Sequence, residues 1–277
     1  MPKKALAILI FNCLVFYLSA QDRYQSSTEF GICVGTQVYY GELNKKLSHV
    51  RSPGYGAYFR YNINRRVGLN FGLWQGKVEG ADSNATDLRA INRNLSFRNT
   101  LTEVSAVLEI NYFDYQISNR EYPYTPYLFL GFAGFISNPQ GKVAGTDDWV
   151  DLRTIGTEGQ NFDDGQPYKK INFAVPFGIG FRANMFKGSA ISVFLGARKT
   201  FTDYIDDVSS FYVDEQLFAT EDQQFVNNSK SNDSGFSSQE GTLRGDPSTN
   251  DWYFIGGFML NIKLNKKRAT CPKWYLN

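Results

Sequence analysis

Apolar and polar side chains alternate along much of this chain, most clearly between Glu103 and Tyr112. Because successive side chains of a strand point to opposite faces, the even positions of this segment form an apolar face and the odd positions a mostly polar one. The same period of two predicts strands near residues 28–41, 53–63, 66–78, 100–115, 124–136, 170–183, 189–202 and 251–264. This pattern predicts an all-β fold, an eight-stranded antiparallel β-barrel.

The polar face indicates which way the barrel wall is oriented. Five charged residues fall in inward register: Arg60, Glu103, Glu109, Arg182 and Arg198. So many charges would be very unfavourable in the apolar interior of a soluble, lipocalin-like barrel, which is the alternative. In an eight-stranded transmembrane barrel they can pair within a lumen narrow enough to be filled by side chains. We therefore predict an OmpA-like transmembrane barrel with a polar lumen network, structural rather than a path for protons or ligands.

The connections between the predicted strands alternate in length. They are short near residues 62–66, 116–123 and 184–188, and long near residues 79–99, 137–169 and 203–250. Outer-membrane barrels have short periplasmic turns and long external loops, so we expect both ends of the barrel chain in the periplasm of an outer-membrane protein. Pro176 falls in an inward slot of the sixth strand, where the missing N–H indicates a bulge.

The first twenty residues have the pattern of a cleaved secretory signal, with Lys3 and Lys4 ahead of an apolar run over residues 5–17. That run is short for a membrane span of about 20 residues. No linker or change of composition divides the rest of the chain. We therefore predict a signal peptide over residues 1–20, a barrel over 21–264 and a basic periplasmic tail over 265–277. A mean hydropathy of −0.35 with 16% aromatic residues suits strands that are only half apolar.

Little in the sequence indicates catalysis. The single histidine, His49, lies near Ser48 and Ser52 in the first predicted external loop, an arrangement that small outer-membrane acyl-transfer enzymes also use. The chain has no G-x-S-x-G turn, no Cys/His group with the spacing of zinc ligands, and no glycine-rich phosphate loop ahead of a helix. We expect no catalytic residue, cofactor, metal or small-molecule substrate, and a location outside the cytoplasm excludes nucleic acid as a partner.

The longest connection is strongly acidic. Residues 203–250 hold ten acids against Lys230 and Arg244, an excess of eight negative charges. We expect a solvated acidic loop, with divalent-ion bridging to a surface glycolipid or contact with a protein partner as alternatives. Aromatic residues alternate with Asp and Ser over 200–212, so we expect this part to be the ordered one.

Two cysteines follow the predicted signal: Cys33, in inward register, and Cys271, in the tail. A bridge between them would need Cα atoms within about 7 Å. A buried free Cys33 and an exposed Cys271 are favoured, because Cys33 faces the lumen. An unpaired thiol in an oxidising compartment suggests intermolecular pairing. We therefore hypothesise that the tail binds a partner through Cys271, Lys266, Lys267, Arg268 and Lys273.

Several short motifs carry a family resemblance: residues 125–129, 156–160, 198–209, 251–254 and 271–273. Together they resemble the PorG-like outer-membrane barrels of the type IX secretion apparatus of the Bacteroidota, over essentially the whole chain after the predicted signal. The most specific part is the run over 198–209, which includes Arg198, Thr200, Asp203, Tyr204, Asp206 and Asp207.

The resemblance implies a non-enzymatic protein of the outer-membrane bilayer. Such a barrel would anchor or position a periplasmic ring of a PorK-like lipoprotein and a PorN-like protein, in machinery that exports proteins and supports gliding in some species. Two alternatives remain from the residues themselves. One is a surface barrel whose acidic loops act as an adhesin or bind glycolipid, and the other is an outer-membrane lipid-modifying enzyme.

Overall fold

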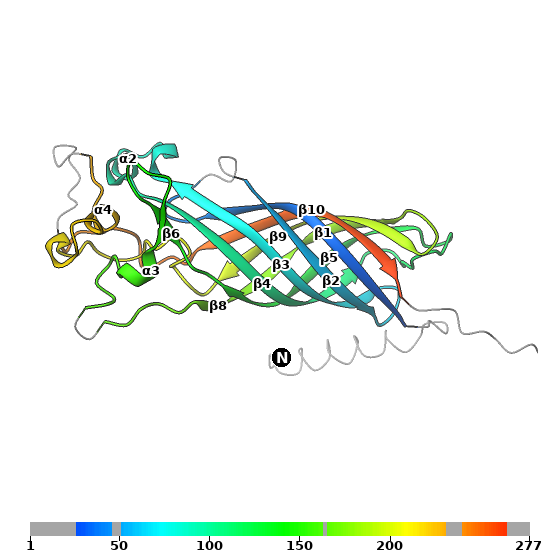
Figure 1. Ribbon diagram of the computed structural model, residues 1–277. Helices are drawn as coiled ribbons and strands as arrows, with labels where there is room; N and C mark the ends of the chain where they lie inside the picture. The colour runs from blue at the N-terminus through cyan, green and yellow to red at the C-terminus, as the bar shows by residue number, and fades with distance from the viewer. Residues whose placement is uncertain (1–25, 46–50, 163–164, 231–239, 265–277) are drawn as a thin grey trace, which may run out of the picture.

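The computed structural model describes residues 26–45, 51–162, 165–230 and 240–264. Eight of its strands pair in the order β3, β2, β1, β10, β9, β8, β5, β4, and a β3–β4 ladder closes the ring into an antiparallel barrel (Figure 1). Their bounds are β1 (Ser27–Tyr40), β2 (Ser52–Asn62), β3 (Val67–Ala81), β4 (Ser96–Asn111), β5 (Tyr124–Ile136), β8 (Ile171–Asn184), β9 (Ser189–Thr200) and β10 (Trp252–Lys263). The predicted fold is confirmed, and each strand boundary lies within four residues of its predicted position.

The outer face of the barrel is apolar. On β5, for example, Leu128, Leu130 and Phe132 are 60%, 58% and 77% exposed, whereas the neighbouring Tyr127 and Phe129 are buried. The same alternation runs along the other barrel strands. An apolar outer wall around a polar interior is the arrangement of a barrel that spans a membrane. No helix in the described segments is long and apolar enough to cross a membrane.

The predicted bulge at Pro176 is not formed. The β5–β8 ladder is interrupted between the Leu130–Phe177 and Ala133–Ala174 pairs, but the same number of residues separates these pairs on both strands. Pro176 therefore only removes a ladder hydrogen bond, and the register is unchanged. The prediction was wrong because a missing donor can be accommodated by a local gap in pairing.

The barrel has two different ends. We call "turn end" the one that holds the start of β1, the end of β10 and the connections over residues 63–66, 112–123 and 185–188. The opposite "loop end" holds the other connections and all the remaining elements (Figure 1). These are η1 (Asp82–Asn84), α2 (Leu88–Arg93), β6 (Gln140–Lys142), β7 (Trp149–Asp151), α3 (Leu152–Ile155), η2 (Glu215–Leu217) and α4 (Gln223–Val226), which the periodicity did not predict.

The turn end is closed by the connection over residues 112–123. Tyr115 and Ile117 of this connection are each 3% exposed and pack with Ala190 of β9. Asn184 fixes the connection from the facing strand, since its Nδ2 donates to the carbonyl oxygens of Gln116 and Asn119 at 3.1 and 3.0 Å. The expected simple turn is instead a folded cap beneath the barrel.

Several predictions fall outside the described residues. These are the signal peptide over residues 1–20, His49, and the tail over 265–277 with Lys266, Lys267, Arg268, Cys271 and Lys273. Cys33 is described, and its thiol is free and buried inside the barrel.

Candidate functional site

An ion-pair network fills the lumen nearer the turn end. Arg60 lies at its centre, where Nη1 donates to Glu29 Oε2 at 2.9 Å and Nη2 donates to Glu109 Oε1 at 3.0 Å. Arg182 also pairs with Glu109, and its guanidinium lies over the Tyr127 ring at 3.9 Å from the centroid. These four charged side chains are all buried, and two arginines balance two glutamates.

A second polar group fills the lumen nearer the loop end. Arg198 Nε donates to Glu103 Oε2 at 3.1 Å, and the Tyr253 hydroxyl donates to the same oxygen at 2.8 Å. Beside them, Trp74 Nε1 donates to Gln37 Oε1 at 2.8 Å. The structure thus places all five residues of the expected lumen network in the interior, in two separate groups. A side-chain-filled lumen is expected for a barrel of this size.

The connection after β9 folds back into the mouth of the barrel at the loop end. Ile205 and Val208 are 0% and 1% exposed and belong to the hydrophobic core. Asn99 of β4 holds this segment by donating from Nδ2 to the Ile205 carbonyl oxygen at 2.7 Å. Residues 200–212 therefore close the mouth, and they are the part of the acidic loop that was expected to be ordered.

Two motifs singled out in the sequence dock against each other at this mouth. Thr157 and Tyr168 donate their hydroxyls to the Asp207 carboxylate at 2.5 and 2.6 Å. Glu158, next to Thr157, accepts hydrogen bonds from the backbone N–H groups of Ser209 and Ser210 at 2.9 and 3.0 Å. The 156–160 motif is thus the support on which the end of the 198–209 motif rests.

Arg244, one of the two bases of the acidic loop, supplies the positive charge at this junction. Its Nη1 donates to Glu158 Oε1 at 2.9 Å and to the Asp207 carbonyl oxygen at 2.5 Å. Burial raises the pKa of Asp207 to about 6, and the nearby Arg244 charge and the hydroxyls of Thr157 and Tyr168 limit the rise.

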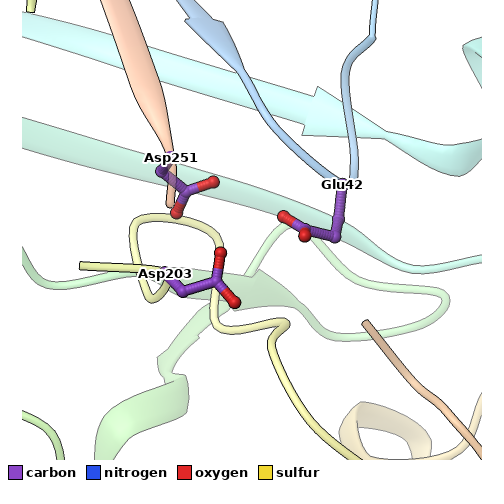
Figure 2. A group of neighbouring side chains, drawn as sticks. All are labelled: Glu42, Asp203 and Asp251. Atoms are coloured by element: carbon purple, nitrogen blue, oxygen red, sulfur yellow. The ribbon is translucent and has the colours of Figure 1, made fainter. Parts of the chain in front are cut away.

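A second group of carboxylates at the mouth has no ion pair with a cation of the described residues. Glu42 lies two residues after the end of β1, Asp203 lies in the connection after β9, and Asp251 directly precedes β10. One oxygen of each lies within 4.8 Å of the others, and Figure 2 shows the three side chains turned toward one another. Asp206 adjoins this group through the Tyr39 hydroxyl, which lies 2.5 Å from Asp206 Oδ2 and 2.8 Å from Asp251 Oδ1.

Burial and mutual repulsion raise the pKa values of these carboxyl groups. Burial is the largest cause for each of them. It raises the pKa of Asp203 to about 8. The nearby Ser209 hydroxyl lowers this pKa, and the negative charge of Glu42 raises it. The pKa values of Asp206 and Asp251 lie well above the usual range for aspartate. The loop end therefore concentrates negative charge in a place where that charge is poorly solvated.

The expectation of a solvated acidic loop is wrong for Asp203, Asp206 and Asp207, which are 8%, 1% and 0% exposed. Their burial follows from the apolar Ile205 and Val208 among them, which draw the segment into the barrel mouth. Of the remaining motif residues, Arg198 lies in the lumen, Thr200 donates its hydroxyl to the Asp251 carbonyl oxygen at 2.6 Å, and Tyr204 stacks on Tyr168 with ring centroids 4.6 Å apart.

The sequence pattern did not identify two acids of these sites, Glu29 in the lumen and Glu42 at the mouth. Glu29 has the same inward parity as Cys33, so the period of two could have identified it as a partner for a lumen arginine. Glu42 carries no periodic signal, because it follows the end of a strand. Its place beside Asp203 and Asp251 depends on contacts between segments far apart in the chain.

The chain belongs to the family described as "Domain of unknown function (DUF6089)", whose model matches residues 3–273. This match includes every element described above. No curated protein sequence matches the chain.

Several solved outer-membrane barrels are similar in shape to this chain. Ail, the attachment invasion locus protein of Yersinia pestis, in complex with the heparin analogue sucrose octasulfate, has a TM-score of 0.42 and 9% identity over 87% of this chain and 99% of its own. Neisserial surface protein A has a TM-score of 0.41 and 10% identity, and OprG of Pseudomonas aeruginosa 0.37 and 10%, each over 87% of this chain and 99% of its own. Likenesses at this level carry no information about ligands or partners.

Proposed function

We propose that this DUF6089 member is a non-enzymatic outer-membrane component of a type IX protein secretion machinery. In this role it anchors or positions the periplasmic ring built from a PorK-like lipoprotein and a PorN-like protein. The observation that carries the proposal is the filled and capped barrel. Balanced ion pairs occupy the lumen at two levels, and residues 112–123 and 200–212 cover its two ends.

A barrel filled in this way offers surfaces to partners and no wide path for solutes. Breaking the lumen ion pairs to open a path would leave buried charges unpaired, which is costly. The same rigidity suits an anchor, because a partner bound at one end is held at a fixed position in the bilayer.

In this proposal the loop end faces the cell exterior and the turn end faces the periplasm, as in other outer-membrane barrels. The cap over residues 112–123 then forms a periplasmic docking surface. Arg120 and Glu121 are exposed on it, and Arg66 stiffens its start by donating from Nε to Asp114 Oδ1 at 2.6 Å.

The basic tail over residues 265–277 is the second proposed contact with the ring. Its cations would attract an acidic partner surface. The Cys271 thiol would then form a disulfide with a cysteine of the ring lipoprotein, with two thiols oxidised by the disulfide-forming system of the periplasm.

The experiment compares variants at the two ends in cells of the native organism. A photo-crosslinking amino acid replaces Arg120 at the turn end or, as a matched control, exposed Glu221 at the loop end. A further strain lacks residues 265–277, and another carries Cys271→Ser. Each strain is scored for folded barrel in the membrane, for ring proteins that co-purify, and for exported proteins in the medium.

We expect crosslinks to the ring lipoprotein from position 120 and none from position 221. We expect loss of co-purification and export when the tail is removed, and loss of a reducible heavier species in Cys271→Ser. Intact export without the tail, with no crosslink from position 120, would contradict the anchor. Crosslinks to surface glycolipid or host molecules from position 221 alone would favour the adhesin or glycolipid-binding alternative.

A further inference from the structure

Three acidic side chains meet at the loop end from three separate parts of the chain. Glu42 comes from the connection after β1, Asp203 from the connection after β9, and Asp251 from the residue before β10. One carboxylate oxygen of each lies within 4.8 Å of the other two, and the side chains converge on a common point in Figure 2. Each segment is held by other contacts, so the convergence does not depend on the carboxylates attracting one another.

Those other contacts are specific. The Ile205 N–H donates to Asp251 Oδ2 at 2.9 Å, and the Leu43 N–H donates to Asp206 Oδ2 at 3.3 Å. The apolar Ile205 and Leu43 themselves are buried in the hydrophobic core. The fold thus brings these acids together although they repel one another.

The charge of the group is not compensated by side chains of the described segments. No ion pair there involves Glu42, Asp203, Asp206 or Asp251. The nearest cation with a direct contact is Arg93, which donates to the Glu42 carbonyl oxygen at 3.3 Å. Its guanidinium is already paired with the Asp82 carboxylate, at 2.7 and 2.8 Å.

The most informative member is Asp203. Its side chain points into the group, the residue is only 8% exposed, and neither carboxylate oxygen has a hydrogen-bond partner in the described structure. Glu42 Oε2 is buried and equally without a partner. Burying an ionised carboxylate without a partner is very unfavourable, so such a group either holds a proton or binds a cation. The convergence of three carboxylates on one point indicates the cation.

The donor set indicates which cation. Three carboxylates and no imidazole or thiolate form a hard, all-oxygen site, which suits Ca²⁺ or Mg²⁺ and not zinc or copper. Ca–O distances of about 2.3–2.6 Å allow two ligand oxygens to lie up to about 5 Å apart, whereas Mg²⁺ requires about 2.1 Å and a strict octahedron. Oxygens spread over as much as 4.8 Å from three different segments fit the larger and more tolerant ion better.

We propose that Glu42, Asp203 and Asp251 bind one Ca²⁺ ion at the loop end of the barrel. The ion clamps the segment after β1, the segment that closes the mouth and the start of β10 to one another. This site is independent of the proposed role in secretion, because it lies at the opposite end from the proposed ring contact.

The test uses the full-length protein, refolded into detergent micelles free of lipopolysaccharide and stripped of metal with EDTA that is then removed. Isothermal titration calorimetry with CaCl₂ and, separately, MgCl₂ measures binding. The variants are Asp203→Asn and Glu42→Gln, and the matched control is Glu221→Gln, an exposed acid of the same end. The shift in migration between heated and unheated samples on a gel verifies that each variant is folded.

We expect one Ca²⁺ per chain in wild type and Glu221→Gln, about tenfold or more weaker binding in Asp203→Asn and Glu42→Gln, and weaker binding of Mg²⁺ than of Ca²⁺. Ca²⁺ should raise the thermal unfolding midpoint of wild type and Glu221→Gln but not of Asp203→Asn. No saturable Ca²⁺ binding at millimolar concentration, or equal binding by wild type and both cluster variants, would overturn the proposal. Tighter binding of Mg²⁺ would overturn the assignment to Ca²⁺.

Discussion

The lumen and the loop-end mouth of this barrel both bury acidic side chains, but the lumen acids are paired with arginines and one group of the mouth acids is not. In the lumen, Glu29 and Glu109 face Arg60 and Arg182, and every carboxylate has a guanidinium partner. At the mouth, Glu42, Asp203 and Asp251 converge without a cation from the described side chains. Asp203 and Asp251 are buried like the lumen acids and Glu42 is partly buried, so the main difference between the two regions lies in the partners of the carboxylates.

The comparison teaches that burial alone does not identify a functional acid. A buried carboxylate that is fully paired stabilises the fold only if both partners stay in place. A buried carboxylate without a partner has a raised pKa and a free coordination position, which are properties of a binding site. On this basis we interpret the lumen network as structural and the mouth cluster as a ligand site.

The largest effect should come from breaking the balanced network. Glu109 accepts hydrogen bonds from Arg60, Asn70 and Arg182. Glu109→Gln leaves two buried guanidinium groups opposite Glu29 alone, and we expect a loss of about 3–5 kcal/mol in the free energy of unfolding. Urea unfolding from lipid vesicles measures it, with exposed Glu121→Gln as the control. A change of similar size in both variants would contradict the role of the network.

The next largest loss of stability should come from placing a charge on the outer, apolar face of the barrel. Leu108 lies on the apolar outer face of β4 and is 41% exposed. We expect Leu108→Arg to cost about 2–4 kcal/mol if it lies near mid-bilayer. Arginine substitutions along β4 should destabilise with a period of two, and Asn111→Arg, in the lumen, should not follow lipid depth. An unfolding series without this period would refute the assigned faces.

The strands and the inward charges could be predicted because both follow from the period of two, which the surrounding lipid imposes on every strand. The parity of Arg60 and Glu109 is enough to place both side chains in the lumen. Their pairing across the barrel depends on the tilt and stagger of non-adjacent strands, which leave no mark in the sequence of either strand.

A smaller effect on stability should come from pH, through Asp207, an acid of the mouth that has hydrogen-bond partners. Asp207 has a folded pKa of about 6, against 3.8 ordinarily. Between these values the folded state holds a proton that the unfolded state has released. The contribution of Asp207 to stability is therefore largest below about pH 4, falls as pH rises from about 4 to about 6, by on the order of 2–3 kcal/mol, and is constant above that range.

Asp207→Asn should lack this component of the pH dependence, because the amide does not titrate. Thermal unfolding midpoints across this pH window, in excess EDTA, check the difference between the two proteins. An equal pH dependence in wild type and Asp207→Asn would show that Asp207 titrates at its ordinary value.

The closure of the mouth could not be predicted from the sequence in the same way as the strands. Residues 203–250 have a large excess of acids, and that composition is typical of a solvated loop. The contrary signal was the placement of Ile205 between Asp203 and Asp206, and of Val208 directly after Asp207. Loop segments have no regular period, so their apolar residues do not indicate which surface they contact.

The smallest effect is expected at His49, which lies outside the described residues. Its substitution tests the alternative of a lipid-modifying enzyme. General acid–base catalysis contributes about 10²–10⁴-fold, so loss of a catalytic histidine would be conspicuous. We expect His49→Ala to leave export and the lipid A profile unchanged at normal amounts of protein. A changed lipid A profile would instead support the lipid-modifying alternative.

The central claim is that the lumen acids are balanced and the mouth acids are not, and one paired measurement tests it directly. Asp203→Asn and Glu109→Gln make the same chemical change, from carboxylate to amide, in the two regions. In excess EDTA near pH 8, about the pKa of Asp203, we predict that Asp203→Asn raises the free energy of unfolding and that Glu109→Gln lowers it. A loss of stability in both variants would contradict the claim.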